Sequence, residues 1–116
     1  MHNPYCMASV SSAENFNVVM RAFMVDLTDV FPENDALQSS LEKFDELVKI
    51  NFKKPQKVFI DLVGKFTEQI IKRDETVFDH LKFPGFSFKN LWEDDISAGT
   101  RGAIWDYLNQ LIFLCV

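Results

Sequence analysis

Few side chains in this sequence have the type and spacing that catalysis or metal binding requires. The two histidines, His2 and His80, lie far apart in the chain. A metal-binding pair on a helix needs two ligands about one turn apart, and His80 has no second histidine at that spacing. We therefore expect His80 to be a surface residue, and we predict neither a catalytic histidine nor a metal site.

Consecutive carboxylates occur at Glu93, Asp94 and Asp95. Such groups can bind a hard cation or share acid–base work. They lack the alternating spacing and the central glycine of a calcium loop, and they precede a serine that is typical of a helix start. Their charge suits the positive N-terminal end of that helix, so we expect a structural role.

Cysteine usage and glycine spacing give no further catalytic or cofactor motif. Cys6 and Cys115 lie at opposite ends of the sequence, which excludes a disulfide framework and favours a reduced, intracellular setting. Neither cysteine has a basic neighbour in the sequence that would lower the pKa of its thiol. The segment 99–102 superficially resembles a phosphate loop but has no Walker lysine and no preceding strand. We predict no cofactor.

The strongest signal for binding is the apolar end of the sequence. Residues 111–116 are apolar on every side of a helix, and such a helix requires burial all round. A surface that contacts another chain would satisfy this pattern. The alternatives are a buried central helix and a polypeptide that ends before its natural boundary. Trp92 is the more open of the two tryptophans, because Trp105 belongs to an apolar stripe. The candidate partner-binding residues are Trp92, Leu111, Phe113 and Leu114.

Charge is distributed unevenly along the chain. The formal net charge is −5, but residues 49–73 carry +5 between acidic flanks of −6 and −4. Such a basic segment can bind nucleic-acid phosphates or anionic head groups, or it can pair with the acidic flanks of its own chain. Cations just before a helix start oppose the helix dipole, and a bound anion would relieve this. The candidate anion-binding residues are Lys53, Lys54, Lys57 and Lys65.

Length and composition indicate one helical domain. The chain has 116 residues, 47% of them hydrophobic, with twelve phenylalanines but only four glycines and four prolines. Many rings and few turn formers favour long helices around an aromatic core over a many-turned β-sandwich. The longest apolar run has six residues, far short of the roughly 20 that span a membrane. We expect a flexible N-terminal tail over 1–10 and a helical domain over 11–116.

Apolar spacing and capping residues predict the elements of an all-α domain with four main helices and one or two short ones. Ser11 and Glu14 form a capping-box pattern before the first helix. Asp35 and Gln38 form a second such pattern. Pro32 and Asn51 are expected to end the first two helices, and Ser97 to cap the last one. Asp74 is expected either to cap a short helix or to continue the third helix through a bend. The ring-rich turn over 83–88 is expected to cover the core. The main helices are predicted at about 12–31, 36–50, 55–70 and 98–114.

Two stretches resemble a known group of proteins. Leu91-Trp92, Ile96-Ser97 and the segment 103–111 (AIWDYLNQL) form one pattern, and the segment 47–55 (LVKINFKKP) with Phe59 forms the other. Both are similar to segments of uncharacterised helical proteins of nucleocytoplasmic large DNA viruses of algae and amoebae. The resemblance covers about half of the chain. It implies a soluble helical viral protein, located in the host cytoplasm, the nucleus or the virion, and it implies no catalytic residues.

These observations favour a non-enzymatic protein that acts through helix surfaces. We expect a structural or accessory protein with a protein partner or with self-association. The alternative is a nucleic-acid-associated helical module that uses the basic segment. A third class, a small enzyme or cofactor binder, would require a deep polar pocket at Asp79, at His80 or at the carboxylates of 93–95.

Overall fold

A computed structural model describes residues 4–83, 86–93 and 96–115, and the side chains of 12–81, 83, 88, 89, 91 and 96–115. This part of the chain is helical apart from one two-residue antiparallel ladder, so the predicted all-α class is confirmed. The main helices are α1 (Pro4–Val30), α2 (Asp35–Ile50), α3 (Lys54–Val63) and α6 (Ala98–Phe113). Shorter elements are the 3-10 helices η1 (Gly64–Phe66) and η2 (Glu75–Asp79), the helices α4 (Thr67–Ile71) and α5 (Phe88–Glu93), and the strands β1 (Lys82–Phe83) and β2 (Phe86–Ser87). The described chain thus has four short helical segments, where the sequence predicted one or two.

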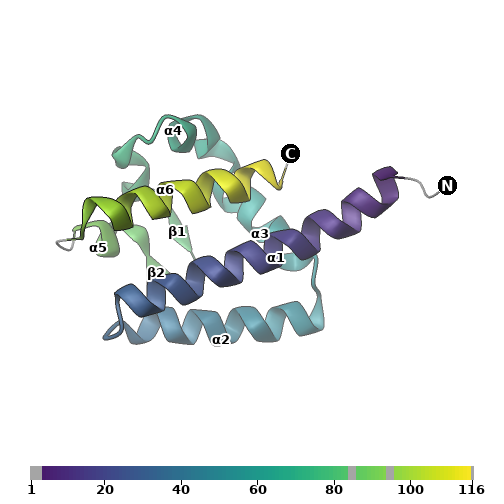
Figure 1. The fold of residues 1–116 in the computed structure, drawn as a ribbon, viewed down its shortest axis with the longest axis horizontal. Coiled ribbons are helices and arrows are strands. Elements are labelled where there is room, and N and C mark those ends of the chain that lie inside the picture. The colour runs from purple at the N-terminus through teal and green to yellow at the C-terminus, as the bar shows by residue number, and fades with distance from the viewer. Residues whose placement is uncertain (1–3, 84–85, 94–95, 116) are drawn as a thin grey trace.

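Helix α1 organises the arrangement of the other elements. It forms an antiparallel hairpin with α2 on one side and lies beside α6 on the other, with α6 also running antiparallel to it (Figure 1). Helices α3 and α4 connect the end of α2 to the far side of α6, and α5 with the β ladder lies near the start of α6 (Figure 1). None of the described helices combines the length and the apolar character that a membrane span needs.

The first helix begins at Pro4 and not near residue 12. Residues 4–10, which we expected to form a flexible tail, are therefore helical here, and Ser11 with Glu14 lies inside the helix and not at its start. A proline fits the first turn of a helix because the missing N–H has no partner there. No glycine interrupts the residues that follow it. The helix ends at Val30, just before Pro32, as predicted.

The predicted caps are correct for α6 but shifted by one residue for α2. Ser97 accepts a hydrogen bond from the Thr100 N–H at 3.1 Å and caps α6. At the start of α2 the cap is Asn34, whose Oδ1 accepts from the Leu37 N–H at 3.3 Å, and Asp35 is the first helical residue.

The predicted third helix is broken at Gly64. Helix α3 ends at Val63, the chain tightens into the 3-10 turn η1, and α4 follows. A Cβ at Gly64 would meet no atom within 4 Å, so this glycine does not serve a close helix crossing. Its low helix propensity is consistent with the break. Asp74 caps a separate segment, as the first of the two alternatives predicted, although that segment is the 3-10 helix η2.

The core is a connected set of rings with Phe88 at its centre. Phe88 is fully buried. Its ring centroid lies 5.0 Å from that of Phe83, 5.6 Å from that of Phe78 and 5.9 Å from that of Phe23. One side chain therefore joins β1, η2 and α1, and each such ring pair adds about 0.5–1.5 kcal/mol beyond the buried area. The expected covering role of the 83–88 turn is confirmed for Phe83 and Phe88, whereas the side chain of Phe86 lies outside the described residues.

Tyr107 of α6 links the same ring set to a carboxylate on α1. Its ring stacks on Phe23 with centroids 4.8 Å apart, and its hydroxyl donates a hydrogen bond to Oδ2 of Asp26. That hydrogen bond, followed by burial and by the negative charge of Asp26, raises the pKa of Tyr107 from 10.0 to about 12. The folded chain therefore favours the neutral phenol.

Replacing Phe88 should reveal how far the fold depends on this ring. We expect Phe88→Ala to lower the free energy of unfolding by about 3–5 kcal/mol, and Phe88→Leu by about 1–3 kcal/mol, since each leaves a cavity. Val18→Ala is the control, because that side chain is 70% exposed and its truncation should change stability by less than about 0.5 kcal/mol. Urea unfolding measures all three variants, and equal losses at the two positions would contradict the central role of Phe88.

The Tyr107–Asp26 bond should make stability depend on alkaline pH. In the unfolded chain Tyr107 loses its proton near pH 10, and in the folded chain near pH 12, so its stabilisation is complete below pH 10 and is lost as the pH rises through 12. Tyr107→Phe keeps the ring contact and should cost about 0.5–1.5 kcal/mol below pH 10. The stability difference between wild type and variant should then shrink towards pH 12, as measured by urea unfolding. A difference that stays constant with pH would contradict this assignment.

Candidate functional site

Helix α6 buries one apolar stripe along its length and leaves other residues exposed. Leu111 has no exposed surface, so its expected contact with a partner is wrong; the helix packs against α1 and α4 of its own chain. Leu114 is half-buried, and the side chain of Trp92 lies outside the described residues. Phe113, by contrast, is 79% exposed. Of the predicted partner-binding residues whose side chains are described, Phe113 alone presents a large free surface.

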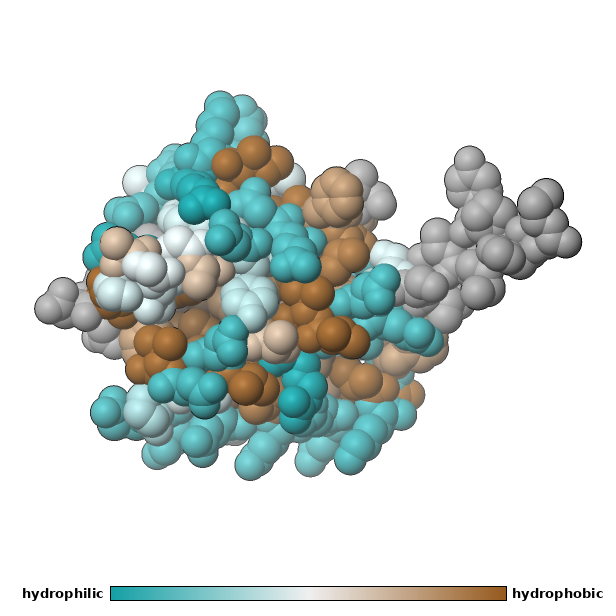
Figure 2. Space-filling view, viewed as in Figure 1, coloured by the Kyte–Doolittle hydropathy of each residue, from teal (hydrophilic) through white to brown (hydrophobic). Residues whose placement is uncertain are grey.

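A groove lies directly beside this exposed ring, between α3 and the C-terminal turns of α6. Its volume is about 160 Å³. Figure 2 shows apolar surface over the C-terminal end of α6 and over α4. Ile60, on the α3 side of the groove, is 44% exposed. The lining residues are Phe59, Ile60, Val63, Gly64, Thr67, Ile112 and Cys115.

Polar contacts hold the end of α6 in place next to α3. The Nε2 group of Gln56 donates to the carbonyl oxygen of Leu114 at 2.9 Å and to Oγ of Ser12 at 3.0 Å. The Ser12 hydroxyl in turn donates to the same carbonyl at 2.5 Å. Three helices therefore meet at one carbonyl group, and the groove has a defined shape because its two sides are fastened together.

Cys115 lies in this groove but is not an activated nucleophile. Burial raises the pKa of its thiol to about 11, and a hydrogen bond with the Gln56 side chain opposes that rise. The thiol is therefore protonated at neutral pH, whereas nucleophilic cysteines have a lowered pKa.

The predicted anion-binding lysines are all exposed, and three of them lie together at the start of α3. Lys53 precedes the helix, and Lys54 and Lys57 lie in its first turn, while Lys65 lies in η1. Among the described residues, no carboxylate is within ion-pair distance of these four lysines. The other end of the basic segment does pair with its own chain. Its two ion pairs are Lys72 with Glu68 at 2.8 Å and Arg73 with Asp106 at 2.7 Å.

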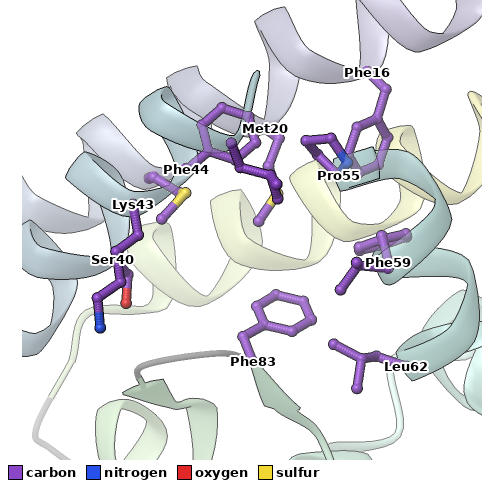
Figure 3. A pocket seen from close by; sticks show the side chains of 12 residues that line it. Phe16, Met20, Ser40, Lys43, Phe44, Pro55, Phe59, Leu62 and Phe83 are labelled. Atoms are coloured by element: carbon purple, nitrogen blue, oxygen red, sulfur yellow. The ribbon is translucent and has the colours of Figure 1, made fainter. Parts of the chain in front are cut away.

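A separate cavity, which is partly open to solvent, lies between α1, α2, α3 and β1 (Figure 3). Its volume is about 130 Å³. Ser40 and Lys43, one turn apart on α2, lie together on one side of it, opposite Leu62 (Figure 3). We did not predict this cavity from the sequence, where Lys43 belongs to the solvent face of its helix. Its remaining lining residues are Phe16, Met20, Met24, Phe44, Leu47, Pro55, Val58, Phe59 and Phe83.

A third hollow, about 420 Å³, lies between the second half of α1 and the first turns of α6. Its polar lining includes Asp26, Asp29 and Ser97 but, among the described side chains, no histidine or cysteine. No group of three potential metal ligands occurs in the part of the chain that the structure describes. His80 is exposed, as expected of a surface residue, and its ring stacks on that of Phe66 with centroids 6.1 Å apart. The side chains of the 93–95 carboxylates lie outside the described residues.

Comparisons of the chain with protein-family models, with curated proteins and with solved structures found no match. The resemblance to proteins of large DNA viruses therefore stays a prediction.

Proposed function

We propose that this chain is a non-enzymatic interaction protein that associates with a second copy of itself through the groove beside Phe113. The observation that carries the proposal is the position of a 79% exposed phenylalanine next to an apolar groove of about 160 Å³. Exposure of a large ring to water is unfavourable, and its burial in a partner contributes about 1.5–3 kcal/mol.

The exposed ring belongs to the same helical turn as Ile112 and Cys115, which line the groove, and this proximity favours a second copy as the partner. In a two-fold dimer each subunit uses the same patch, so the Phe113 ring of one copy can enter the groove of the other, and the reverse contact forms by symmetry. Each copy then buries its exposed ring and has its groove filled in the same contact.

The charges next to the groove are compatible with this pairing. Lys57, Asp61 and Lys65 follow one another at four-residue spacing along α3 and η1, and all three are exposed. When two such segments run antiparallel with a shift of about one turn, Lys57 of each copy meets Asp61 of the other. The resemblance to helical proteins of large DNA viruses supports a structural or accessory role for such an assembly, in an infected cell or a virion.

Phe113→Asp should abolish the association without unfolding the chain. We expect sedimentation equilibrium of the wild type to show a monomer–dimer equilibrium that depends on concentration, and the variant to stay monomeric because a carboxylate cannot be buried unpaired. Val18→Asp is the matched control, since Val18 is 70% exposed on α1, outside the groove lining, and this variant should behave like the wild type. A monomeric wild type, or dimers of Phe113→Asp that match the wild type, would overturn the proposal.

The exposed lysines at the start of α3 favour a second candidate, a nucleic-acid-associated module. The supporting observation is that Lys53, Lys54, Lys57 and Lys65 form no ion pair with any described carboxylate, whereas Lys72 does. Such lysines can neutralise phosphates and release counterions.

Binding of a short fluorescent DNA duplex or RNA strand, followed by anisotropy, tests this candidate. Affinity should fall with salt at a log–log slope of about −3 for some three neutralised phosphates. Lys53→Gln combined with Lys54→Gln should weaken binding and reduce that slope, while Lys72→Gln should change neither. The absence of binding at low salt would exclude this function.

A further inference from the structure

The partly open cavity beside Lys43 has the size of a small-molecule site. Its volume is about 130 Å³, and most of its lining is apolar. Ligand sites are typically concave and mostly apolar, with few polar groups. At roughly 30 Å³ per carbon, the value for water in the liquid, this space holds about four or five carbon atoms.

The lining of the cavity is apolar except on one side. Rings of Phe16, Phe44, Phe59 and Phe83 contribute to its walls together with the flexible side chain of Met20 (Figure 3). A methionine adapts its shape to an occupant more readily than a branched side chain does. An apolar group placed here would be removed from water on most sides.

Lys43 is the single charged side chain among the described residues that line the cavity. It is exposed as a whole residue, and no described carboxylate lies within ion-pair distance of it. Its ammonium group can therefore stay hydrated while its stem borders the apolar space, as lysines often do. A ligand in the cavity would meet a positive charge at this side and no negative one in the lining.

We propose that the cavity binds a small amphiphile with one carboxylate, such as a short-chain acyl acid, with the hydrocarbon inside and the carboxylate at Lys43. The apolar volume accommodates a hydrocarbon chain of about four or five carbons. The single lysine selects a monoanionic head group. This proposal does not rest on association through the groove beside Phe113, so the failure of either proposal leaves the other standing.

Titration of the folded, full-length chain with a homologous series tests the size limit. Saturable shifts of backbone NMR signals from residues that line the cavity report binding of butanoate, hexanoate, octanoate and dodecanoate. Affinity should rise about fourfold for each methylene that becomes buried, up to about hexanoate, and then level off. A continued gain up to dodecanoate, as expected for a lipid-binding surface, or no saturable binding of hexanoate, would overturn the proposal.

Two variants separate the roles of the cavity and the lysine. Leu62→Phe adds volume to the lining and should abolish hexanoate binding while the chain stays folded. Lys43→Met should weaken hexanoate about three- to fivefold but leave hexan-1-ol unchanged, and Lys49→Met, an exposed lysine of α2 outside the lining, should affect neither ligand. Unchanged hexanoate binding by Leu62→Phe, or equal losses for acid and alcohol in Lys43→Met, would overturn the assignment.

Discussion

The packing of the Phe88 ring is the contact on which the rest of the structure depends. It joins two neighbouring short elements, η2 with Phe78 and β1 with Phe83, to α1 with Phe23, which is far from them in the sequence. The short elements between α4 and α6 are too small to be stable by backbone hydrogen bonds alone. They gain order by burying rings, and through them the start of α6 acquires its place beside α1.

Local sequence patterns predicted the elements whose signals are local. Ser97 caps α6 and Pro32 follows the end of α1, since each acts on its own backbone. The helix start predicted from the capping-box pattern of Ser11 and Glu14 was wrong, because such a pattern marks a start only where the preceding residues are not helical. The prediction that Leu111 binds a partner was wrong because an apolar stripe shows that one side of the helix is buried, but not whether its own chain or another chain buries it. For the site, Phe113 was identified from the sequence, whereas the cavity was not, because a void arises from the fit of four elements and leaves no pattern in any one of them.

Helix α6 combines burial and exposure within one turn. Leu111 and Ile112 are buried, and Phe113 next to them is not, since a step of one residue rotates a side chain about 100° around the helix. The contacts of Gln56 and Ser12 with the Leu114 carbonyl fix this turn against α3 and α1. The exposed ring is therefore presented on a rigid support, which lowers the entropy cost of any association that uses it.

Phe59 contributes to the lining of both the cavity beside Lys43 and the groove beside Phe113. The Phe59 ring therefore lies between the cavity and the groove, and its position affects the free volume of both. A displacement of this ring towards one hollow enlarges the other. Where an occupant of one hollow displaces this ring, thermodynamic linkage makes the effect reciprocal, so an occupant of the other hollow changes the affinity of the first by the same factor.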